Sequence, residues 1–360
     1  MLSIPRFATL FLLPLLFFVQ LTGGACIPKR AGVAPALSGN AVTFGAGTYP
    51  RATRLSNGNL LGAYTSTSNG ENIINIVIST NNGASWQAQG IATRGVGDID
   101  NPFPIQLSSG RVLVAFRNHS KDANGNYTFF RITVCFSDDL GKTWQFLSQP
   151  ASDPAGPNGN WEPFMRLSNA NVLQLYYSRE NSKTDQDSLL RTSTDGGATW
   201  STAAVISGGE LSGNRDGMLG VATCGTGQPL VAIFETVPVG GQFSVWSVRS
   251  TDDGKTWGDR RQVYQPTGTN NNAGAPQIIC VGGTTLVASF MTDEDTSAHQ
   301  WPQQAAMKIL TSNDGGITWG HKTTAFAVPG FWPGLLTLDS TSFLALADHN
   351  GAKAQKIVLN

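Results

Sequence analysis

One eight-residue motif recurs along this chain and constrains its fold more than any other feature. The pattern Ser-x-Asp-x-Gly-x-Thr-Trp occupies residues 137–144, 193–200, 250–257 and 312–319, and a degenerate copy with Asn81 and Ser85 occupies residues 79–86. The tryptophans of successive copies are 58, 56, 57 and 62 residues apart. A motif that returns at this near-constant spacing indicates a repeat architecture.

The residue types of the motif are those of a hairpin turn. The Asp side chain accepts hydrogen bonds from turn amides, Gly permits a positive φ, and Trp packs against a neighbouring strand. The motif resembles the Asp-box of sialidase-like β-propellers. We therefore assign it a structural role and no catalytic one.

A second pattern is in phase with the first. Two apolar strands separated by a Gly/Asn/Ser turn occur six times, and a third strand then leads into each motif. The six copies are residues 49–64, 101–117, 161–178, 216–235, 273–291 and 331–347. Each unit of about 57 residues predicts a four-stranded meander, the size of one propeller blade.

The ends of the chain predict how the ring closes. The last unit has a third strand, residues 352–359, but no fourth, and residues 37–44 precede the first unit without a partner. We expect residues 37–44 to supply the missing strand, which removes an exposed edge. No helical periodicity is sustained. The fold class is thus all-β, with residues 37–360 forming a single six-bladed β-propeller.

The N-terminal residues have the pattern of an export signal. Arg6 precedes an apolar stretch and small residues follow it, so residues 1–25 are expected to be a secretory signal peptide. Residues 26–36 form a short segment in which Lys29-Arg30 fits either a dibasic processing site or a charged linker. Two sequons begin at Asn118 and Asn126. We expect a secreted, extracellular, soluble glycoprotein.

The charge balance and the cysteine spacing limit the classes of molecule that this protein is expected to bind. The chain has 24 Lys and Arg residues and 24 Asp and Glu residues, so it has no net charge that would attract nucleic acid or an anionic membrane. We expect an uncharged partner and a monomeric protein. The cysteines and histidines show no metal-ligand spacing. A Cys224–Cys280 bridge and buried free thiols, Cys135 included, are both open.

Blade geometry places the chemistry on one face of the ring. The start of each first strand and the end of each second strand lie on the same face, opposite the Asp-box turns. Acids, arginines and aromatics gather at these positions, and they include Arg51, Asp100, Trp161, Arg179, Asp216 and Trp332. Concave sites with a few placed polar groups are typical binding sites.

Two glutamates stand out on this face. Glu162 and Glu235 are embedded in apolar strands of adjacent blades, where a carboxylate is costly unless a partner or a function offsets it. Two carboxylates flanking one sugar bond are the usual equipment of a glycosidase. Partial burial among aromatics raises one pKa, so that one acid stays protonated while the other is ionised. Two structural acids bonded to rim amides are the alternative.

Several segments around these glutamates resemble the fungal exo-arabinanases of glycoside hydrolase family 93. They are Trp-Glu-Pro-Phe at 161–164, Tyr-Tyr-Ser-Arg-Glu-Asn at 176–181, Asp-Gln-Asp at 185–187 and Phe-Glu at 234–235. The resemblance implies a retaining enzyme that releases arabinobiose from linear α-1,5-arabinan, without metal or organic cofactor. Glu162 maps to the nucleophile and Glu235 to the general acid/base. We expect Trp161 and Trp332 to stack on sugar rings. The residues expected to bind sugar hydroxyls are Arg51, Asp100, Arg179 and Asp216.

Two other functions fit a propeller of this kind. A sialidase needs three arginines around a carboxylate and a Tyr–Glu pair, and Arg51 occupies one suitable position, but blades five and six offer no rim arginine. A non-catalytic glycan-binding propeller is expected to repeat similar pockets, whereas the rim here differs from blade to blade.

Overall fold

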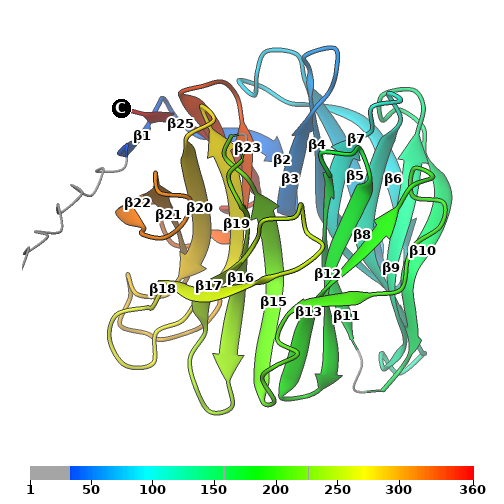
Figure 1. Cartoon of the computed structure of the whole chain (residues 1–360). Helices are drawn as coiled ribbons and strands as arrows, with labels where there is room; N and C mark the ends of the chain where they lie inside the picture. Colours follow the sequence, from blue (N-terminus) through cyan, green and yellow to red (C-terminus); the bar gives the residue numbers. More distant parts are fainter. Residues whose placement is uncertain (1–32, 157–158, 226) are drawn as a thin grey trace, which may run out of the picture. The chain divides into compact units, whose positions relative to one another are not determined.

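The described part of the chain consists of strands joined by turns and loops. The computed structural model describes residues 33–156, 159–225 and 227–360, and these form twenty-five strands (Figure 1). Within those ranges we find no helix long and apolar enough to pass through a membrane. The expected signal peptide, the dibasic pair Lys29-Arg30 and Cys26 lie outside the described residues.

The strands follow one another as antiparallel strand groups in chain order. The first group is β3 (Thr48–Arg54), β4 (Leu60–Ser68), β5 (Glu71–Ser79) and β6 (Gln87–Gly95), and the second is β7 (Asp98–Gln106), β8 (Val112–Lys121), β9 (Tyr127–Ser137) and β10 (Gln145–Pro154). The third is β11 (Asn160–Leu167), β12 (Leu173–Ser182), β13 (Asp185–Ser193) and β14 (Ala204–Ser207). The fourth is β15 (Asn214–Ala222), β16 (Leu230–Pro238), β17 (Ser244–Ser250) and β18 (Gly258–Tyr264).

The fifth group is β19 (Ala273–Val281), β20 (Thr285–Thr292), β21 (Ala306–Ser312) and β22 (Gly320–Phe326). The last contains β23 (Phe331–Thr337), β24 (Ser342–Asp348) and β25 (Ala352–Leu359). Two short strands near the N-terminus, β1 (Pro35–Leu37) and β2 (Val42–Gly45), both pair antiparallel with β25. The outer edge of the last group is therefore covered by the beginning of the described chain.

Hydrogen bonding divides these strands into five sheets, where the sequence predicted six blades of four strands. The difference arises because the third and fourth groups are joined into one eight-stranded sheet by a single parallel bridge, Gln186↔Arg215. The other sheets contain one strand group each.

The strand groups are arranged in a closed ring. The first strand of each group contacts the first strand of the next, in the order β3, β7, β11, β15, β19 and β23, and β23 contacts β3 again (Figure 1). Buried apolar clusters fill the interfaces between neighbouring groups. One such cluster unites Leu61 and Ile76 with Val114, and another closes the ring between Leu60 and Leu346. The structure is an all-β propeller.

The repeated motif forms the predicted turns. In the second group, Asp139 Oδ1 accepts a hydrogen bond of 2.9 Å from the Thr143 amide, and Asp139 Oδ2 accepts one of 2.6 Å from the Thr143 hydroxyl. The Ser137 hydroxyl accepts a bond of 2.8 Å from the Gly141 amide, and Gly141 has a φ of 88°. These bonds hold the pKa of Asp139 well below its usual range. The motif therefore stabilises a turn and contributes nothing to the opposite face.

A β-bulge recurs near the start of every innermost strand. The pairing of each first strand with its second strand shifts register at this point. One residue of each bulge is not Gly yet has a positive φ, between 39° and 56°: Tyr49, Asn101, Glu162, Met218, Ala275 and Trp332. Proline follows in five of the six cases, the exception being Leu219. A proline lacks the N–H that a regular ladder needs, so it is tolerated where pairing is interrupted.

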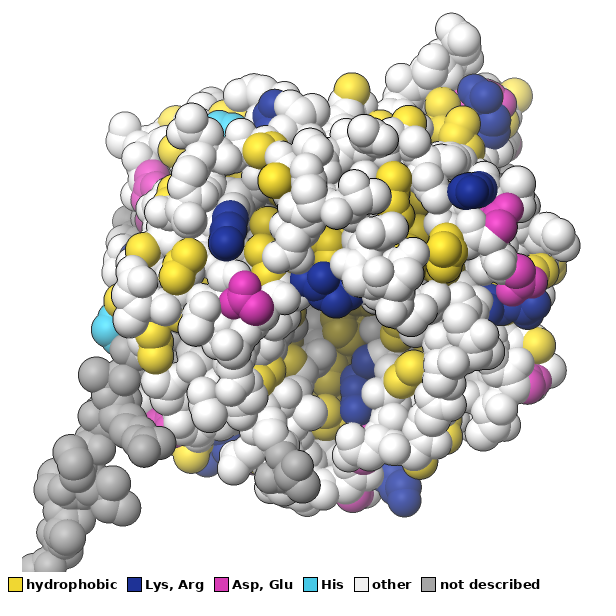
Figure 2. All heavy atoms as spheres, turned by 90° about the horizontal axis from the view of Figure 1, so that it is seen from above, with side chains coloured by type: hydrophobic (Ala, Val, Ile, Leu, Met, Phe, Trp, Pro, Cys, Tyr) yellow, Lys and Arg dark blue, Asp and Glu magenta, His cyan; other side chains and the backbone are white. Residues whose placement is uncertain are grey.

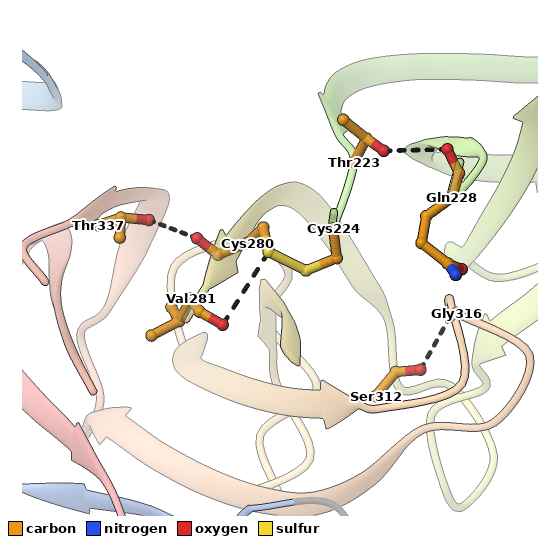
Figure 3. Close-up of a disulfide and its surroundings, with 8 residues drawn as sticks. All are labelled: Thr223, Cys224, Gln228, Cys280, Val281, Ser312, Gly316 and Thr337. Atoms are coloured by element: carbon orange, nitrogen blue, oxygen red, sulfur yellow. Dashed lines mark hydrogen bonds between the residues drawn. A yellow bond between two sulfur atoms is a disulfide. The ribbon is translucent and has the colours of Figure 1, made fainter. Parts of the chain in front are cut away.

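A disulfide joins the fourth and fifth strand groups. Cys224, just after β15, is bonded to Cys280 in β19 with a Cα–Cα distance of 5.3 Å (Figure 3). The Cys280 carbonyl also accepts a 2.8 Å hydrogen bond from the Thr337 hydroxyl of β23. Cys135 is a buried free thiol. The sequence left open a Cys224–Cys280 bridge and buried free thiols, and the described residues contain both: that bridge and the free thiol of Cys135.

Removing this disulfide should destabilise the ring without changing its chemistry. The two cysteines are 56 residues apart, and closing a loop of that length is worth about 4 kcal/mol in the chain-entropy treatment. We expect the Cys224→Ser/Cys280→Ser double variant to lose about 2–4 kcal/mol of unfolding free energy in denaturant titrations. Reductant should destabilise the wild-type protein and Cys135→Ser alike but leave the double variant unchanged. Equal stability of the wild-type protein, Cys135→Ser and the double variant in the absence of reductant would contradict the assignment.

Candidate active site

A pocket of about 250 Å³ lies where the third and fourth strand groups meet, and it contains both singled-out glutamates. Its wall is formed by Arg117, Trp161, Glu162, Glu180, Gln186, Arg215, Glu235 and Phe243. Strand pairing explains why they converge. Asp100 pairs with Arg117, Trp161 with Ser178 and Gly217 with Glu235, so the end of each second strand lies beside the bulge of the first.

Glu162 is held on the bulge of β11. Its φ is 39°, and Pro163 follows, so the backbone departs from the ladder at the carboxylate. One oxygen, Oε2, is buried without a hydrogen-bond partner. The pKa of Glu162 is raised to about 8, mainly by burial and also by the charge of Glu235, while the Arg117 guanidinium and a hydrogen bond with Ser178 act against the rise.

Glu235 extends from the end of β16 toward the fifth strand group. Its Oε2 accepts a 2.7 Å hydrogen bond from the Ala275 amide, at the bulge of β19. Burial raises the pKa of Glu235 to about 7, while this amide and the Arg215 guanidinium act against the rise. Both carboxyl groups thus titrate well above the ordinary carboxyl range. Near neutral pH the pair carries one proton, which is the state that acid–base catalysis by two carboxyls requires.

Gly274 makes room for the Glu235 carboxylate. A Cβ at this position would lie 2.4 Å from Glu235 Oε2 and 3.2 Å from Cζ2 of Trp301. The Trp301 ring in turn stacks on Phe243, with centroids 5.9 Å apart and planes at 29°. An aromatic pair therefore flanks Glu235, and only glycine allows the carboxylate and the indole to approach the strand together.

Arg117 is a pocket residue that the sequence did not single out for binding. Its Nη2 donates to Asp98 at 2.9 Å and to Asp100 at 3.1 Å, and its guanidinium lies 5.2 Å from the Trp161 ring centroid. The Tyr127 hydroxyl donates to the other oxygen of Asp98 at 2.7 Å. Two carboxylates thus fix the cation beside Glu162.

Four more wall residues were not among the expected substrate-binding residues: Glu180, Gln186, Arg215 and Phe243. Arg215 Nη2 donates to Glu180 Oε1 at 2.6 Å and to Gln186 Oε1 at 2.8 Å. Phe243 lies in the loop between β16 and β17, where no sequence pattern indicates orientation. The sequence places Glu180 and Arg215 at strand ends on the site face. Pairing each strand end with the bulge beside it, which the recurring X-Pro dipeptides mark, indicates which of these charged residues lie next to the glutamates.

Two predicted substrate-binding residues are bonded to partners within the protein. Asp216 is fully buried, and both its oxygens accept hydrogen bonds from Arg260, at 2.6 and 2.9 Å. Arg51 is only 3% exposed, and its Nη1 donates to the carbonyls of Pro50 and Trp332 at 2.9 and 3.0 Å. Neither side chain is part of the pocket wall. The contacts of Asp216 with Arg260 and of Arg51 with the Trp332 carbonyl join residues far apart in the chain, which the sequence alone does not reveal.

The other predicted binding residues lie around the pocket rather than in its wall, except for Trp161, which lines it. Asp100 lies behind Arg117 and accepts the bond described above. Arg179 donates to the Asn181 side chain at 3.3 Å. Trp332 packs on Tyr49, with ring centroids 6.0 Å apart, in an apolar cluster. Over the described ranges no group of three or more His, Cys, Asp or Glu residues could hold a metal ion.

Comparison with known proteins places the fold. No protein-family model matches the chain, and no curated sequence matches it. An α-L-arabinanase of Penicillium chrysogenum complexed with arabinobiose is 19% identical over 90% of this chain and 99% of that chain, with a TM-score of 0.70. The α-L-arabinofuranosidase of Fusarium graminearum from family GH93, also with arabinobiose, is 21% identical over 89% and 98%, with a TM-score of 0.69.

A Hadza microbial sialidase is more distant: it is 17% identical over 86% of this chain and 65% of that chain, with a TM-score of 0.62. The structure thus resembles the fungal GH93 arabinanases, as the glutamate segments suggested. At these identities the likeness shows a shared propeller fold.

Burying the two carboxyls should make stability depend on pH. The folded pKa of Glu162 is about 8, above the ordinary 4.5, so its ionisation opposes folding. The contribution of the protonated Glu162 carboxyl to the free energy of unfolding is complete below pH 4.5 and is lost as the pH rises toward 8. We expect Glu162→Gln to be more stable than the wild-type protein by about 2–4 kcal/mol at pH 8, with no difference near pH 4. Thermal unfolding across this pH range measures it, and a pH-independent difference would contradict it.

Gly274→Ala should impair the site while leaving the fold intact. The new methyl group would collide with Glu235 Oε2, so the carboxylate must move away from the Ala275 amide. A displacement of this size can lower kcat/KM by about 10²-fold. Gly258→Ala is the matched control, because a Cβ there meets nothing within 4 Å. Equal activity of the two variants on whichever glycan the wild-type protein hydrolyses would exclude this role for Gly274.

Proposed function

We propose that this protein is a secreted glycoside hydrolase that releases arabinobiose from the ends of linear α-1,5-arabinan with retention of configuration. The observation that carries the proposal is the pair Glu162 and Glu235 in one pocket, with both pKa values raised toward neutrality. Counting each strand group as one blade, the scaffold is a six-bladed propeller. We further propose a monomeric glycoprotein without a membrane anchor.

A neutral sugar polymer suits the surface and the pocket. The chain has no net charge, and on the face seen in Figure 2 acidic and basic side chains are scattered among uncharged ones. The two arabinan-related neighbours were each solved with arabinobiose. A small pocket, rather than an open groove, accommodates a chain end. These observations support an exo-acting enzyme for arabinan.

The proposed reaction has two displacement steps. The protonated Glu235 carboxyl gives its proton to the glycosidic oxygen, the C1–O bond breaks, and a Glu162 oxygen bonds to C1. Glu235, now ionised, takes a proton from water, whose oxygen bonds to C1 as the bond to Glu162 breaks. Arabinobiose leaves with its original configuration. This scheme needs carboxyls about 5–5.5 Å apart.

The proton of the pair must rest on Glu235 when substrate is bound. In the empty pocket Glu162 has the higher pKa, about 8 against about 7 for Glu235. Moving the proton to Glu235 therefore costs about 1.4 kcal/mol, the free energy of one pKa unit. A hydrogen bond from the Glu235 carboxyl to the glycosidic oxygen, which forms only when substrate is bound, supplies energy of that order. We therefore retain Glu162 as the nucleophile and Glu235 as the acid/base.

A sialidase is the less favoured function. The pocket wall contains the arginines Arg117 and Arg215, and each is already ion-paired with carboxylates of this chain. Arg51, the residue expected in a carboxylate clamp, donates to backbone carbonyls instead. A clamp for the carboxylate of sialic acid is therefore not assembled among the described residues.

Product analysis tests the proposal directly. Incubation with debranched arabinan should give arabinobiose as the sole early product, and Glu162→Gln or Glu235→Gln should lower kcat by about 10²–10⁴-fold while near-ultraviolet circular dichroism stays unchanged. Release of sialic acid would identify a sialidase. Glycan binding without turnover would identify a binding protein.

Azide rescue in the same experiment assigns the roles. With an aryl arabinobioside, Glu235→Ala should yield the α-azide, because azide attacks the covalent intermediate. Glu162→Ala should yield the β-azide, because azide enters the space vacated by the nucleophile. The reverse pattern would exchange the two roles.

A further inference from the structure

We infer that Arg215 is a positioning residue that locks the third strand group to the fourth and so fixes the two glutamates relative to each other. The inference rests on the proposed function of Glu162 and Glu235. Its starting point is the bridge Gln186↔Arg215, which among the described strands is the one pairing that joins two strand groups. That junction lies between the groups that carry the two glutamates.

The side chain of Arg215 reinforces this bridge. From β15 it reaches three residues of the third group: its Nη2 bonds to Glu180 and Gln186, and its Nη1 donates to the Lys183 carbonyl at 3.1 Å. In the opposite direction, Gln186 Nε2 of the third group donates a 3.1 Å hydrogen bond to the Asp216 carbonyl of the fourth. These bonds run in both directions across the boundary, so the two strands cannot slide past each other without breaking several of them.

Gly217 shows how closely the two groups approach. A Cβ at this position would lie 2.2 Å from Gln186 Nε2, so the contact requires glycine. Gly217 pairs directly with Glu235. The strand that Arg215 holds is therefore the one beside the Glu235 carboxylate.

The lock is also connected to Glu162. Ser178, two residues before Glu180 on β12, hydrogen-bonds to Glu162 and accepts a 3.1 Å bond from the Met218 amide of β15. Ser178 and Glu180 belong to β12, and Met218 and Arg215 belong to β15. The ion pair of Arg215 with Glu180 therefore joins the same two strands as the bond between Ser178 and Met218. Its charge also faces the pocket and lowers the pKa of Glu235.

A second ion pair between the same strand groups provides a matched control. Arg166 Nη2 lies 2.7 Å from Asp253 Oδ1, with side chains 13% and 22% exposed, against 25% and 20% for Arg215 and Glu180. Asp253 belongs to an Asp-box turn, so this pair lies on the opposite face. Arg166→Met removes a comparable cross-group contact away from the pocket.

The test compares Arg215→Met, Arg215→Lys and Arg166→Met. We expect Arg215→Met to lower kcat by about 10²-fold, with a smaller change in KM, and to move the alkaline limb of the pH profile upward. Arg215→Lys should keep the limb near its wild-type position, because it keeps the charge, but should lose part of kcat. Arg166→Met should lower stability and change neither kcat nor the limb.

Three results would overturn the inference: equal effects of Arg215→Met and Arg166→Met, a rise in KM alone, or an unmoved limb in Arg215→Met. A carbon-13 NMR titration of the glutamate carboxyls decides independently of turnover. It should show a higher Glu235 pKa in Arg215→Met and an unchanged one in Arg166→Met, and equal values would contradict the inference. If the wild-type protein hydrolyses no glycan, the proposed function fails, while this titration still decides whether the Arg215 charge acts on Glu235, and the extra loss of unfolding free energy in Arg215→Met over Arg215→Lys still measures the contacts across the boundary.

Discussion

The bulge at the start of each innermost strand is the constraint on which the site depends. It interrupts the regular pairing at the same level in every strand group and holds one non-glycine residue at positive φ. Such a backbone is costly, about 1–3 kcal/mol per residue, and is retained where surrounding structure enforces it. In five groups the bulge carries other residues, and in the third it carries Glu162. The repeated scaffold thus produces one asymmetric pocket through the choice of side chain alone.

Placing two carboxyls in that pocket trades stability for reactivity. Desolvation raises both pKa values, the charge of Glu235 adds to the rise at Glu162, and each ionised group weakens the fold. The cost is limited by partners that favour the charged forms: Ser178 and Arg117 at Glu162, and the Ala275 amide at Glu235. The disulfide and the apolar clusters between strand groups supply the stability that a strained polar centre consumes.

Periodicity in the sequence predicted the strand groups, the Asp-box turns and the meeting of Glu162 and Glu235 at one pocket, because strand direction alone decides which ends share a face. It could not predict which polar side chains remain free. Asp216 and Arg51 are consumed by Arg260 and by the Trp332 carbonyl, contacts that cross 44 and 281 residues of sequence. Hydrogen bonding between two strand groups, which reduces the sheets to five, likewise depends on one pair of residues and leaves no periodic signal.

The central claim is that two carboxyls from neighbouring strand groups lie close enough for the charge of Glu235 to raise the pKa of Glu162. The most direct measurement is a carbon-13 NMR titration of the Glu162 carboxyl in the wild-type protein and in Glu235→Gln. Removing the neighbouring negative charge should lower the Glu162 pKa from its value of about 8, because the charge of Glu235 is, after burial, the largest cause of the rise. An unchanged Glu162 pKa in this variant would show that the two groups do not interact and would contradict the proposed active site.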